Sequence, residues 1–286
     1  MRKYKFGGMS LGFTLVIPLI WLAQPGATAV APESEVHSVT VPFSESSRPG
    51  LLKMSLLSGS ITVRVHSQPD VVFEYSSPAL VRDDEERKEG EMFVIRNDSF
   101  DFEITENDNI MDFDMDSWNN RVTLINVKVP VNTSLKLETV NGNILVEGVA
   151  GGLELAGVNG RIEATSISGL VVAETVNGSV KVEFNEITPD RFMAFSTHNG
   201  RIDVTFPPDI KADVYLDTTR GSIYSDFKIE LDNSPVMVSD DTDERGTRIK
   251  VEKQLRGTIN GGGPEMRFET YNGSIYIRSS TGRAKD

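Results

Sequence analysis

The stretch Leu135–Val182 decides the fold, and it reads LKLETVNGNILVEGVAGG, then LELAGVNGRIEATSISGL, then VVAETVNGSVKV. In each unit a short segment of alternating apolar and polar residues leads into Val-Asn-Gly, and a second alternating segment leads out. The unit restarts after about 18 residues. So short a period is typical of architectures that stack one small unit many times. Alternation within each segment indicates strands with one buried face, so the repeat predicts an all-β fold.

Further copies of this unit occupy much of the chain, at intervals of about 18 to 22 residues apart from one longer gap. The longer gap contains an expected acidic loop at Asp240–Glu244 and a degenerate copy at Arg256–Ile259. An early, divergent copy and three later copies are found at Leu57–Val63, Thr197–Ile202, Thr218–Ile223 and Thr270–Ile275.

Alignment of the copies on their glycines identifies the interior, because residues two apart on a strand share one face. A threonine stands three residues before most of the glycines. Apolar side chains stand five residues before and two residues after them. The predicted core columns are Met54, Leu137, Leu155, Ala173, Phe195, Leu216 and Phe268 before the glycine, and Ile61, Ile144, Ile162, Val180, Ile202, Ile223 and Ile275 after it.

The Asn-Gly pair at the centre of each copy predicts a sharp turn, since glycine adopts positive φ freely and asparagine tolerates it. Two architectures fit: antiparallel hairpins or blades, in which each pair is a hairpin turn, and a solenoid, in which each pair is a corner between stacked coils. The short period and a column of asparagines, which suits stacked amide ladders, favour the solenoid. The expected structural turns are Asn141, Gly142, Asn159, Gly160, Asn177, Gly178, Asn199, Gly200, Asn272 and Gly273.

The first residues predict a secretory signal peptide. A basic start (Arg2, Lys3 and Lys5) precedes an apolar run, and Ala27-Thr28-Ala29 is a small-residue cleavage signal. The apolar run is shorter than the roughly 20 residues that a membrane span needs. We therefore expect a signal peptide at residues 1–29 and a single β-solenoid domain at 30–286, exported and not inserted in the membrane, with an acidic insertion or cap at about 82–120.

The acidic segment Asp98–Asn120 interrupts the repeat and also carries aromatic residues. We expect Phe113, Met115 and Trp118 to pack on the first full coils, where they would cover a strand edge that otherwise invites aggregation. Asp112, Asp114 and Asp116 resemble the start of a calcium loop, but the glycine and glutamate of an EF-hand are missing. A looser calcium site and a solvated acidic loop both stay open.

The TVNGxI units, the strand RVTLINVKVP before them and the ending INGGGPEMRFETYNGSIYIRS resemble the bacterial exported β-solenoid domain labelled "putative adhesin", a domain of unknown function. The resemblance covers about Val39–Ser279. It implies a right-handed parallel β-helix and an exported location, here with coils of about 18–22 residues. The segment Arg82–Asn120 departs from the family pattern because it is unusually acidic and aromatic.

Composition limits the functions further. The chain of 286 residues has a formal charge of −13 and no cysteine, so nucleic acid and anionic membrane surfaces are excluded as partners and disulfides do not contribute. His37, His66 and His198 lie far apart and form no zinc-type pattern. Glu138 and Glu174 share one outward position, with Ala156 between them.

Two function classes follow. The first is an exported, non-enzymatic envelope or surface protein, periplasmic or on the cell surface, with an adhesin-like binding or structural role toward an unknown protein or glycan, and with no cofactor. The second is a glycan-active β-helix enzyme, a polysaccharide lyase or hydrolase, since such enzymes use carboxylate pairs that project from adjacent strands. The sequence favours the first class because it contains no catalytic motif.

Overall fold

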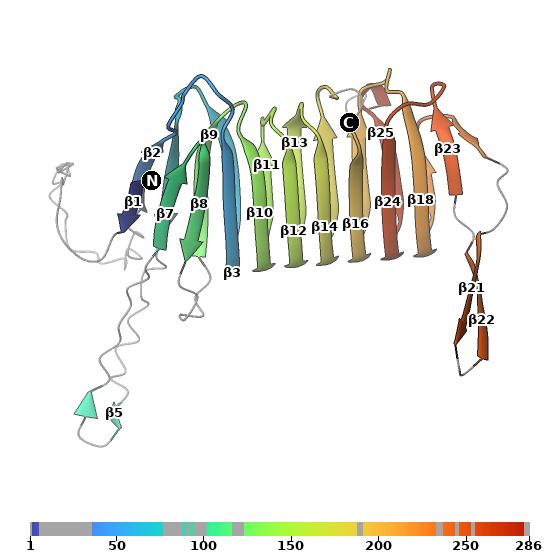
Figure 1. The fold of residues 1–286 in the computed structure, drawn as a ribbon, viewed down its shortest axis with the longest axis horizontal. Helices are drawn as coiled ribbons and strands as arrows, with labels where there is room; N and C mark the ends of the chain where they lie inside the picture. Colours follow the sequence, from blue (N-terminus) through green and yellow to red (C-terminus); the bar gives the residue numbers. More distant parts are fainter. Residues whose placement is uncertain are drawn as a thin grey trace, which may run out of the picture.

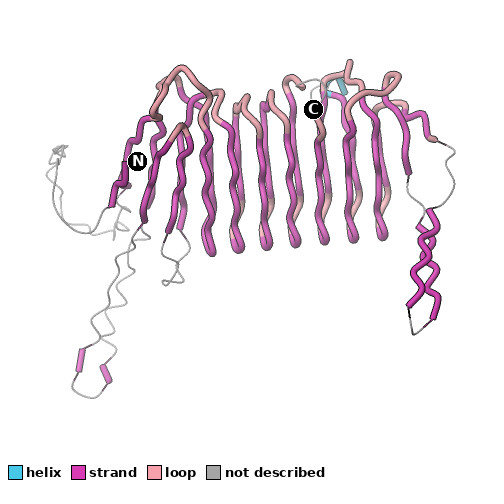
Figure 2. The backbone as a smooth tube through the Cα atoms, in the orientation of Figure 1, coloured by secondary structure: helices cyan, strands magenta, loops and turns pink. Residues whose placement is uncertain are grey.

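The computed structural model describes residues 2–5, 36–76, 88–89, 92–93, 102–115, 123–187, 191–232, 237–243, 246–252 and 255–282. These residues form an elongated stack of strands that lie side by side across its length (Figure 1). No α-helix occurs in these ranges, and none of their segments is a helix long and apolar enough to cross a membrane. The tube view shows loops gathered at one long edge of the stack and tight corners at the other (Figure 2). We call these the loop edge and the turn edge.

The strands form two sheets, A and B, that enclose the core. Within each sheet the repeat strands pair in parallel, and β3 (Leu51–His66) is long enough to run through both sheets. In spatial order sheet A contains β1 (Arg2–Lys5), β7 (Phe102–Asn107), β8 (Ile110–Met115), β3, β10 (Ser134–Asn141), β12 (Leu153–Asn159), β14 (Val171–Asn177), β16 (Met193–Asn199), β24 (Glu265–Asn272), β18 (Ala212–Arg220), β23 (Leu255–Ile259) and β20 (Ile229–Leu231).

Sheet B faces sheet A across the core. Its strands are β2 (Val36–Pro42), β4 (Asp70–Ser76), β9 (Thr123–Pro130), β3, β11 (Ile144–Glu147), β13 (Ile162–Ile167), β15 (Val180–Phe184), β17 (Ile202–Phe206), β25 (Ile275–Ser279) and β19 (Ile223–Ser225). Outside the two sheets lie β5 (Lys88–Glu89) with β6 (Met92–Phe93), β21 (Met237–Asp243) with β22 (Gly246–Glu252), and the short 3₁₀ helix Ser280–Gly282.

This pairing decides between the two architectures left open by the sequence. The strand before Asn141 lies in sheet A and the strand after it lies in sheet B, so the Asn-Gly pair is a corner and not a hairpin turn. Like residues pair across neighbouring coils: Leu137 with Leu155, and Asn141 with Asn159. The chain therefore has the all-β, β-helix-like fold that the repeat predicted.

The core consists of the columns found by alignment. All the residues of the column before the glycine are buried, and in the column after it only Ile223 is partly exposed. Phe195 stacks on Phe268 with ring centroids 5.1 Å apart, and Phe184 stacks on Phe206 at 5.2 Å. Like side chains thus meet one strand spacing apart and fill a continuous apolar interior, which the hydrophobic effect stabilises in proportion to the buried area.

The order of the coils differs from the order of the copies in the chain. The last copy, β24 and β25, lies between the coil of β16 and the coil of β18. The degenerate copy Arg256–Ile259 is not a coil, because β23 runs antiparallel to β18. Asp240–Asp243, expected in an acidic loop, belong to the hairpin of β21 and β22. A local sequence pattern specifies a strand but not the neighbour with which it pairs.

The turn edge is held by two columns of side-chain hydrogen bonds. The expected amide ladder is present: Asn159 Nδ2 donates to Asn141 Oδ1 (2.9 Å), and Asn177, Asn199 and Asn272 continue the series at 3.0, 2.9 and 2.8 Å. Inside the corner, Thr175 Oγ1 donates to the Gly160 carbonyl oxygen at 3.1 Å. Equivalent bonds are made by Thr139, Thr197, Thr218 and Thr270.

The glycines of the corner serve a purpose other than the expected one. Positive φ occurs in this column only at Gly59 (144°) and Gly160 (158°), and at none of the asparagines, so φ does not explain the other corner glycines. Space is what requires glycine: a Cβ on Gly178 would lie 1.9 Å from the Gly160 carbonyl oxygen. The same short distances, 1.8–1.9 Å, recur at Gly142, Gly160, Gly200, Gly221 and Gly273. Close backbone stacking between coils is therefore the reason for glycine at these corners.

Residues 102–115 of the acidic segment lie at one end of the stack. β7 and β8 are a hairpin whose turn residues Asp108 and Asn109 have φ of 51° and 61°, as a type I′ turn requires. Phe113 is buried against Phe73 and Phe102 at 5.5 and 5.3 Å. Packing on the first coils is therefore confirmed for Phe113 and for Met115, which is partly buried on the core. Trp118 lies outside the described residues.

Steric exclusion at the turn edge is directly testable. We expect Gly178→Ala to destabilise the protein by about 1–3 kcal/mol, because the new methyl group forces two coils apart. Gly152→Ala is the matched control, since its Cβ would meet Leu170 at an ordinary 3.4 Å. The control should change the unfolding free energy by at most about 1 kcal/mol. Equal denaturant midpoints for the two variants would contradict the steric account.

Candidate functional site

The outer faces of the two sheets differ in how their charges are arranged. On sheet B, cations and carboxylates alternate across neighbouring strands and pair with each other. Lys181 Nζ lies 2.7 Å from a Glu163 oxygen, and Arg278 Nε lies 2.7 Å from Asp203 Oδ1. Arg64 pairs with Glu147 at 3.2 Å. This face is electrostatically satisfied from within the chain.

These pairs alter the acid–base behaviour of their members. The hydrogen bond from Lys181 lowers the pKa of Glu163 below its ordinary value, and burial opposes the effect. The hydrogen bond to Asp203 raises the pKa of Arg278. Arg201 and Arg278 also lie over the ring of Tyr276, at 5.5 and 5.0 Å from its centroid. The sheet B face is thus a network of ion pairs and ring contacts.

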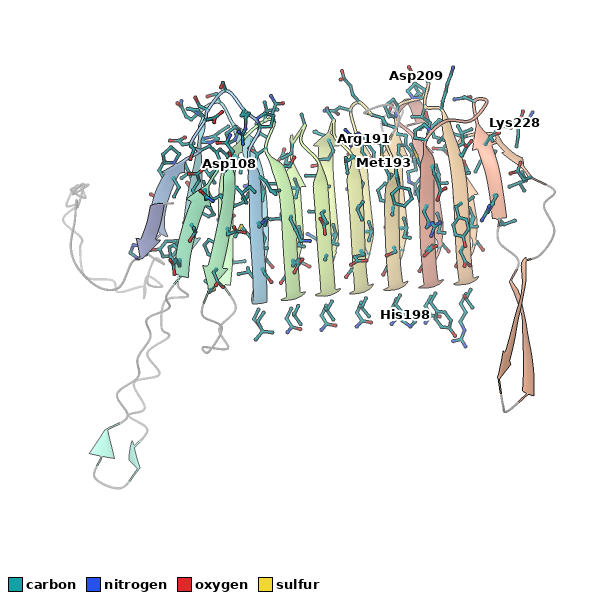
Figure 3. The ribbon with its side chains drawn as sticks, in the orientation of Figure 1. Asp108, Arg191, Met193, His198, Asp209 and Lys228 are labelled. Carbon is teal, nitrogen blue, oxygen red and sulfur yellow. The ribbon has the colours of Figure 1, made fainter. Side chains whose placement is uncertain are left out.

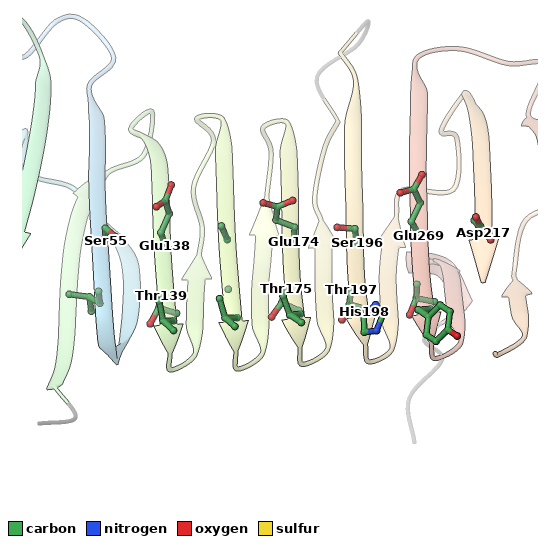
Figure 4. A pocket seen from close by; sticks show the side chains of 18 of the residues that line it. Ser55, Glu138, Thr139, Glu174, Thr175, Ser196, Thr197, His198, Asp217 and Glu269 are labelled. Atoms are coloured by element: carbon green, nitrogen blue, oxygen red, sulfur yellow. The ribbon is translucent and has the colours of Figure 1, made fainter. Parts of the chain in front are cut away.

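The outer face of sheet A carries two parallel rows of side chains that cross the coils near the turn edge. In Figure 4 the labelled side chains of one row, Glu138, Glu174, Ser196, Glu269 and Asp217, stand at about the same height on their strands. The acidic row is Ser55, Glu138, Ala156, Glu174, Ser196, Glu269 and Asp217, in register from β3 to β18. The apolar row, one step closer to the corner, is Leu57, Val140, Val158, Val176, His198, Tyr271 and Thr219.

A hollow of about 660 Å³ follows these rows and is lined by both. It is open because Ala156 is small, so that Glu138 and Glu174 project on either side of it. The apolar row contributes exposed surface to it: Val158, Val176 and Tyr271 are 37%, 42% and 39% exposed. Hydrophobic side chains placed side by side on an outer face are more informative than isolated ones.

The charges of the hollow are only partly balanced. Lys136 donates to Glu154 at 2.6 Å, which raises its pKa, and lies 3.8 Å from Glu138. Arg267 lies 3.7 Å from Glu269. Within the described ranges, neither Glu174 nor Asp217 has an ion-pair partner. Sheet A therefore presents carboxylates that are available to an external cation.

Two aromatic rings line the hollow, one on β16 and one on β24. His198 and Tyr271 stack almost in parallel, with centroids 4.9 Å apart and planes at 2°, and Arg220 lies 5.5 Å from the Tyr271 centroid. His198 is near the turn edge, far from the loop edge that carries Asp108 and Asp209 (Figure 3). The ring pair extends the apolar row with a flat, amphipathic surface.

The residues singled out in the sequence fall in different places. Glu138 and Glu174 meet at the hollow with Ala156 between them, as their common outward position suggested. Asp112 and Asp114 point outward from β8, where Asp112 lies 3.4 Å from Lys53, and Asp116 is not among the described residues. Over the part of the chain that the structure describes, no group of three His, Asp or Glu residues is placed to hold a metal ion.

Sequence reasoning did not identify the apolar row or the His198–Tyr271 pair as parts of one surface. Val140, Val158 and Val176 are visible in the repeat as the residues before each asparagine. Their partner Tyr271 belongs to the coil that inserts beside β16, so its position depended on the unpredicted order of the coils.

No protein-family model matches the chain, and no curated protein matches it. Among solved structures it is similar to a "putative cell adhesion protein" from Clostridium sporogenes ATCC 15579, with 12% identity and a TM-score of 0.48, over 87% of this chain and 100% of the other. It is also similar to a "putative adhesin" from Bacteroides fragilis NCTC 9343, with 12% identity and a TM-score of 0.39, over 88% and 100% of the two chains. Similarities this low leave the function to be argued from the geometry of the chain itself.

The ion pairs of sheet B predict a pH dependence. Because the pKa of Glu163 is lowered in the folded state, its contribution to stability is present above its ordinary value of 4.5 and is lost as the pH falls through the lowered pKa. Glu163→Gln should therefore destabilise the protein at pH 7 and have progressively less effect toward pH 3, measured by denaturant unfolding. In a Lys181→Met background the same substitution should lose most of this pH dependence, and an unchanged dependence would contradict the pairing.

Proposed function

We propose that this chain is an exported, non-enzymatic β-solenoid protein with an adhesin-like binding role, and that it contacts its partner through the hollow on the outer face of sheet A. The observation that carries the proposal is the contrast between the two faces. The charges of sheet B are paired within the chain, whereas sheet A combines an exposed apolar row with two carboxylates, Glu174 and Asp217, that have no ion-pair partner within the described ranges. Contiguous apolar surface rimmed by polar groups is a feature of interaction sites.

The repetition of the two rows along the stack favours an elongated partner. As part of the proposal, the coils wind in a right-handed sense with about 18–22 residues each, as the resemblance of the repeat implies. The two rows continue across the coils from β3 to β18, so a ligand that lies along the stack meets the same chemistry repeatedly. Many modest contacts in series can then supply affinity that no single contact provides.

Export is the second part of the proposal, and it rests on the sequence of residues 1–29. In the structure β1 (Arg2–Lys5) pairs antiparallel with β7. Cleavage of the signal peptide near Ala29 would remove β1 and leave β7 at the end of sheet A. The mature chain would act in the periplasm or on the cell surface.

A second candidate function, a glycan-active enzyme, is favoured by one observation: Glu138 and Glu174 flank Ala156 in the same hollow. Their strands lie two spacings apart, about 9.4–9.8 Å. Inverting glycosidases hold their carboxyl groups roughly 6.5–9.5 Å apart, so the side chains would have to lean toward each other. Because both candidates use the same hollow, one experiment can separate them.

The experiment is to incubate the purified mature protein with arrays of polysaccharides and extended peptides, and to assay both retention and released sugar products. Ala156→Trp fills the hollow and should abolish retention of the bound ligand. Thr165→Trp, on the outer face of sheet B, is the matched control and should bind as the wild type does.

Three results would decide between the candidates. Retention that is sensitive to Ala156→Trp, without released products, supports the binding role. Reducing ends or unsaturated sugars that disappear in Glu138→Gln or Glu174→Gln would replace it with the enzyme. Retention that is insensitive to Ala156→Trp would remove the hollow as the site.

A further inference from the structure

The carboxylates of the acidic row recur with a regular spacing. Along the register, Glu138, Glu174 and Glu269 stand on alternate coils, and the smaller Ala156 and Ser196 stand on the coils between them. Neighbouring strands lie about 4.7–4.9 Å apart, so the three glutamates recur about every 9.4–9.8 Å along the stack. Because Ala156 and Ser196 are small, the surface between the glutamates is recessed.

The spacing of the glutamates can be compared with the repeat distances of extended peptide conformations. A polyproline II helix has three residues per turn and rises about 3.1 Å per residue, so its side chains three apart lie on one face about 9.3 Å from each other. In a β-strand, residues on one face recur at about 6.6–6.8 Å, which does not match the glutamates. The geometric match favours a polyproline II segment that lies along the stack, across the strands.

The charge of the hollow selects the side chains of that ligand. Glu174 has no cation partner within the described ranges, and Glu138 and Glu269 have only the longer contacts of 3.8 and 3.7 Å with Lys136 and Arg267. A cationic side chain of the ligand beside each glutamate would neutralise the negative charge of the acidic row. The net charge of −13 would also steer a basic ligand toward the protein.

We propose that the hollow binds a proline-rich segment of a partner protein in the polyproline II conformation, with lysine or arginine at every third residue. This inference rests on the proposed binding function and specifies its ligand. The basic side chains reach Glu138, Glu174 and Glu269, while the apolar residues between them lie on the apolar row from Val140 to the His198–Tyr271 pair. A polyproline II segment is already extended before it binds, so little conformational entropy is lost.

The test uses fluorescence anisotropy with a labelled peptide of repeated Pro-Pro-Lys. A peptide of the same composition, with all its lysines at one end, controls for charge alone. We expect the repeating peptide to bind more tightly than the control peptide. Its affinity should fall as salt is added, because salt screens the charges. The triple variant Glu138→Gln, Glu174→Gln and Glu269→Gln should weaken binding by roughly tenfold to a hundredfold, at about two- to fivefold for each exposed pair.

The matched control variant carries the same charge change on the other face: Glu147→Gln, Glu163→Gln and Glu183→Gln on sheet B. It should bind the repeating peptide within about twofold of the wild type, as expected when distant surface charges change. Circular dichroism and denaturant midpoints of both triple variants establish that each is folded.

Three results would overturn the inference: no binding of the repeating peptide at low salt, equal binding of the two peptides, or equal losses in the two triple variants. Failure of the inference is distinguishable from failure of the proposed function. If a polysaccharide or an unrelated peptide is retained in the arrays and lost in Ala156→Trp, the hollow remains a binding site and only the assignment of its ligand is wrong.

Discussion

The close approach of successive corners is the constraint on which the structure depends. Each corner glycine lies against the carbonyl oxygen of the glycine in the neighbouring coil, at a distance that leaves no room for a Cβ. This contact fixes neighbouring coils one strand spacing apart and in register. Once the register is fixed, asparagine meets asparagine, threonine meets a glycine carbonyl oxygen, and aliphatic side chains meet aliphatic side chains. A one-residue slip would instead turn every core side chain outward.

The same register determines the outer surface, because a residue that faces outward in one coil lies beside its equivalent in the next. On sheet B the equivalents alternate in sign, and the result is a set of ion pairs. On sheet A the equivalents are carboxylates separated by small residues, beside a row of apolar side chains, and the result is a hollow whose charge is only partly compensated. The two faces therefore differ because a few outward positions of the repeat carry different residues. Stacking of the coils aligns these positions in rows.

Local features of this fold could be predicted from the sequence, and long-range features could not. The core columns, the amide ladder of Asn141 and its equivalents, and the shared face of Glu138 and Glu174 follow from spacing alone. The insertion of β24 beside β16 was not predicted, although the copy at Thr270 keeps the asparagine, Asn272, that continues the ladder from Asn199, whereas the copy at Thr218 has Arg220 in that place. The reason for glycine at the corner also required the structure, since crowding between coils is invisible in one coil. The position of Tyr271 in the hollow depends on the order of the coils, because β24 pairs with β16.

The claim that the outer face of sheet A is the contact surface is tested most directly by carboxylate footprinting. The protein is labelled with a carbodiimide and an amine, alone and after mixing with bacterial cell envelopes, and the modified residues are quantified by mass spectrometry. Contact through sheet A should reduce the labelling of Glu138, Glu174 and Glu269 in the presence of envelopes and leave the labelling of Glu147 and Glu163 unchanged. Reduced labelling on sheet B alone, or equal labelling of both faces with and without envelopes, would contradict it.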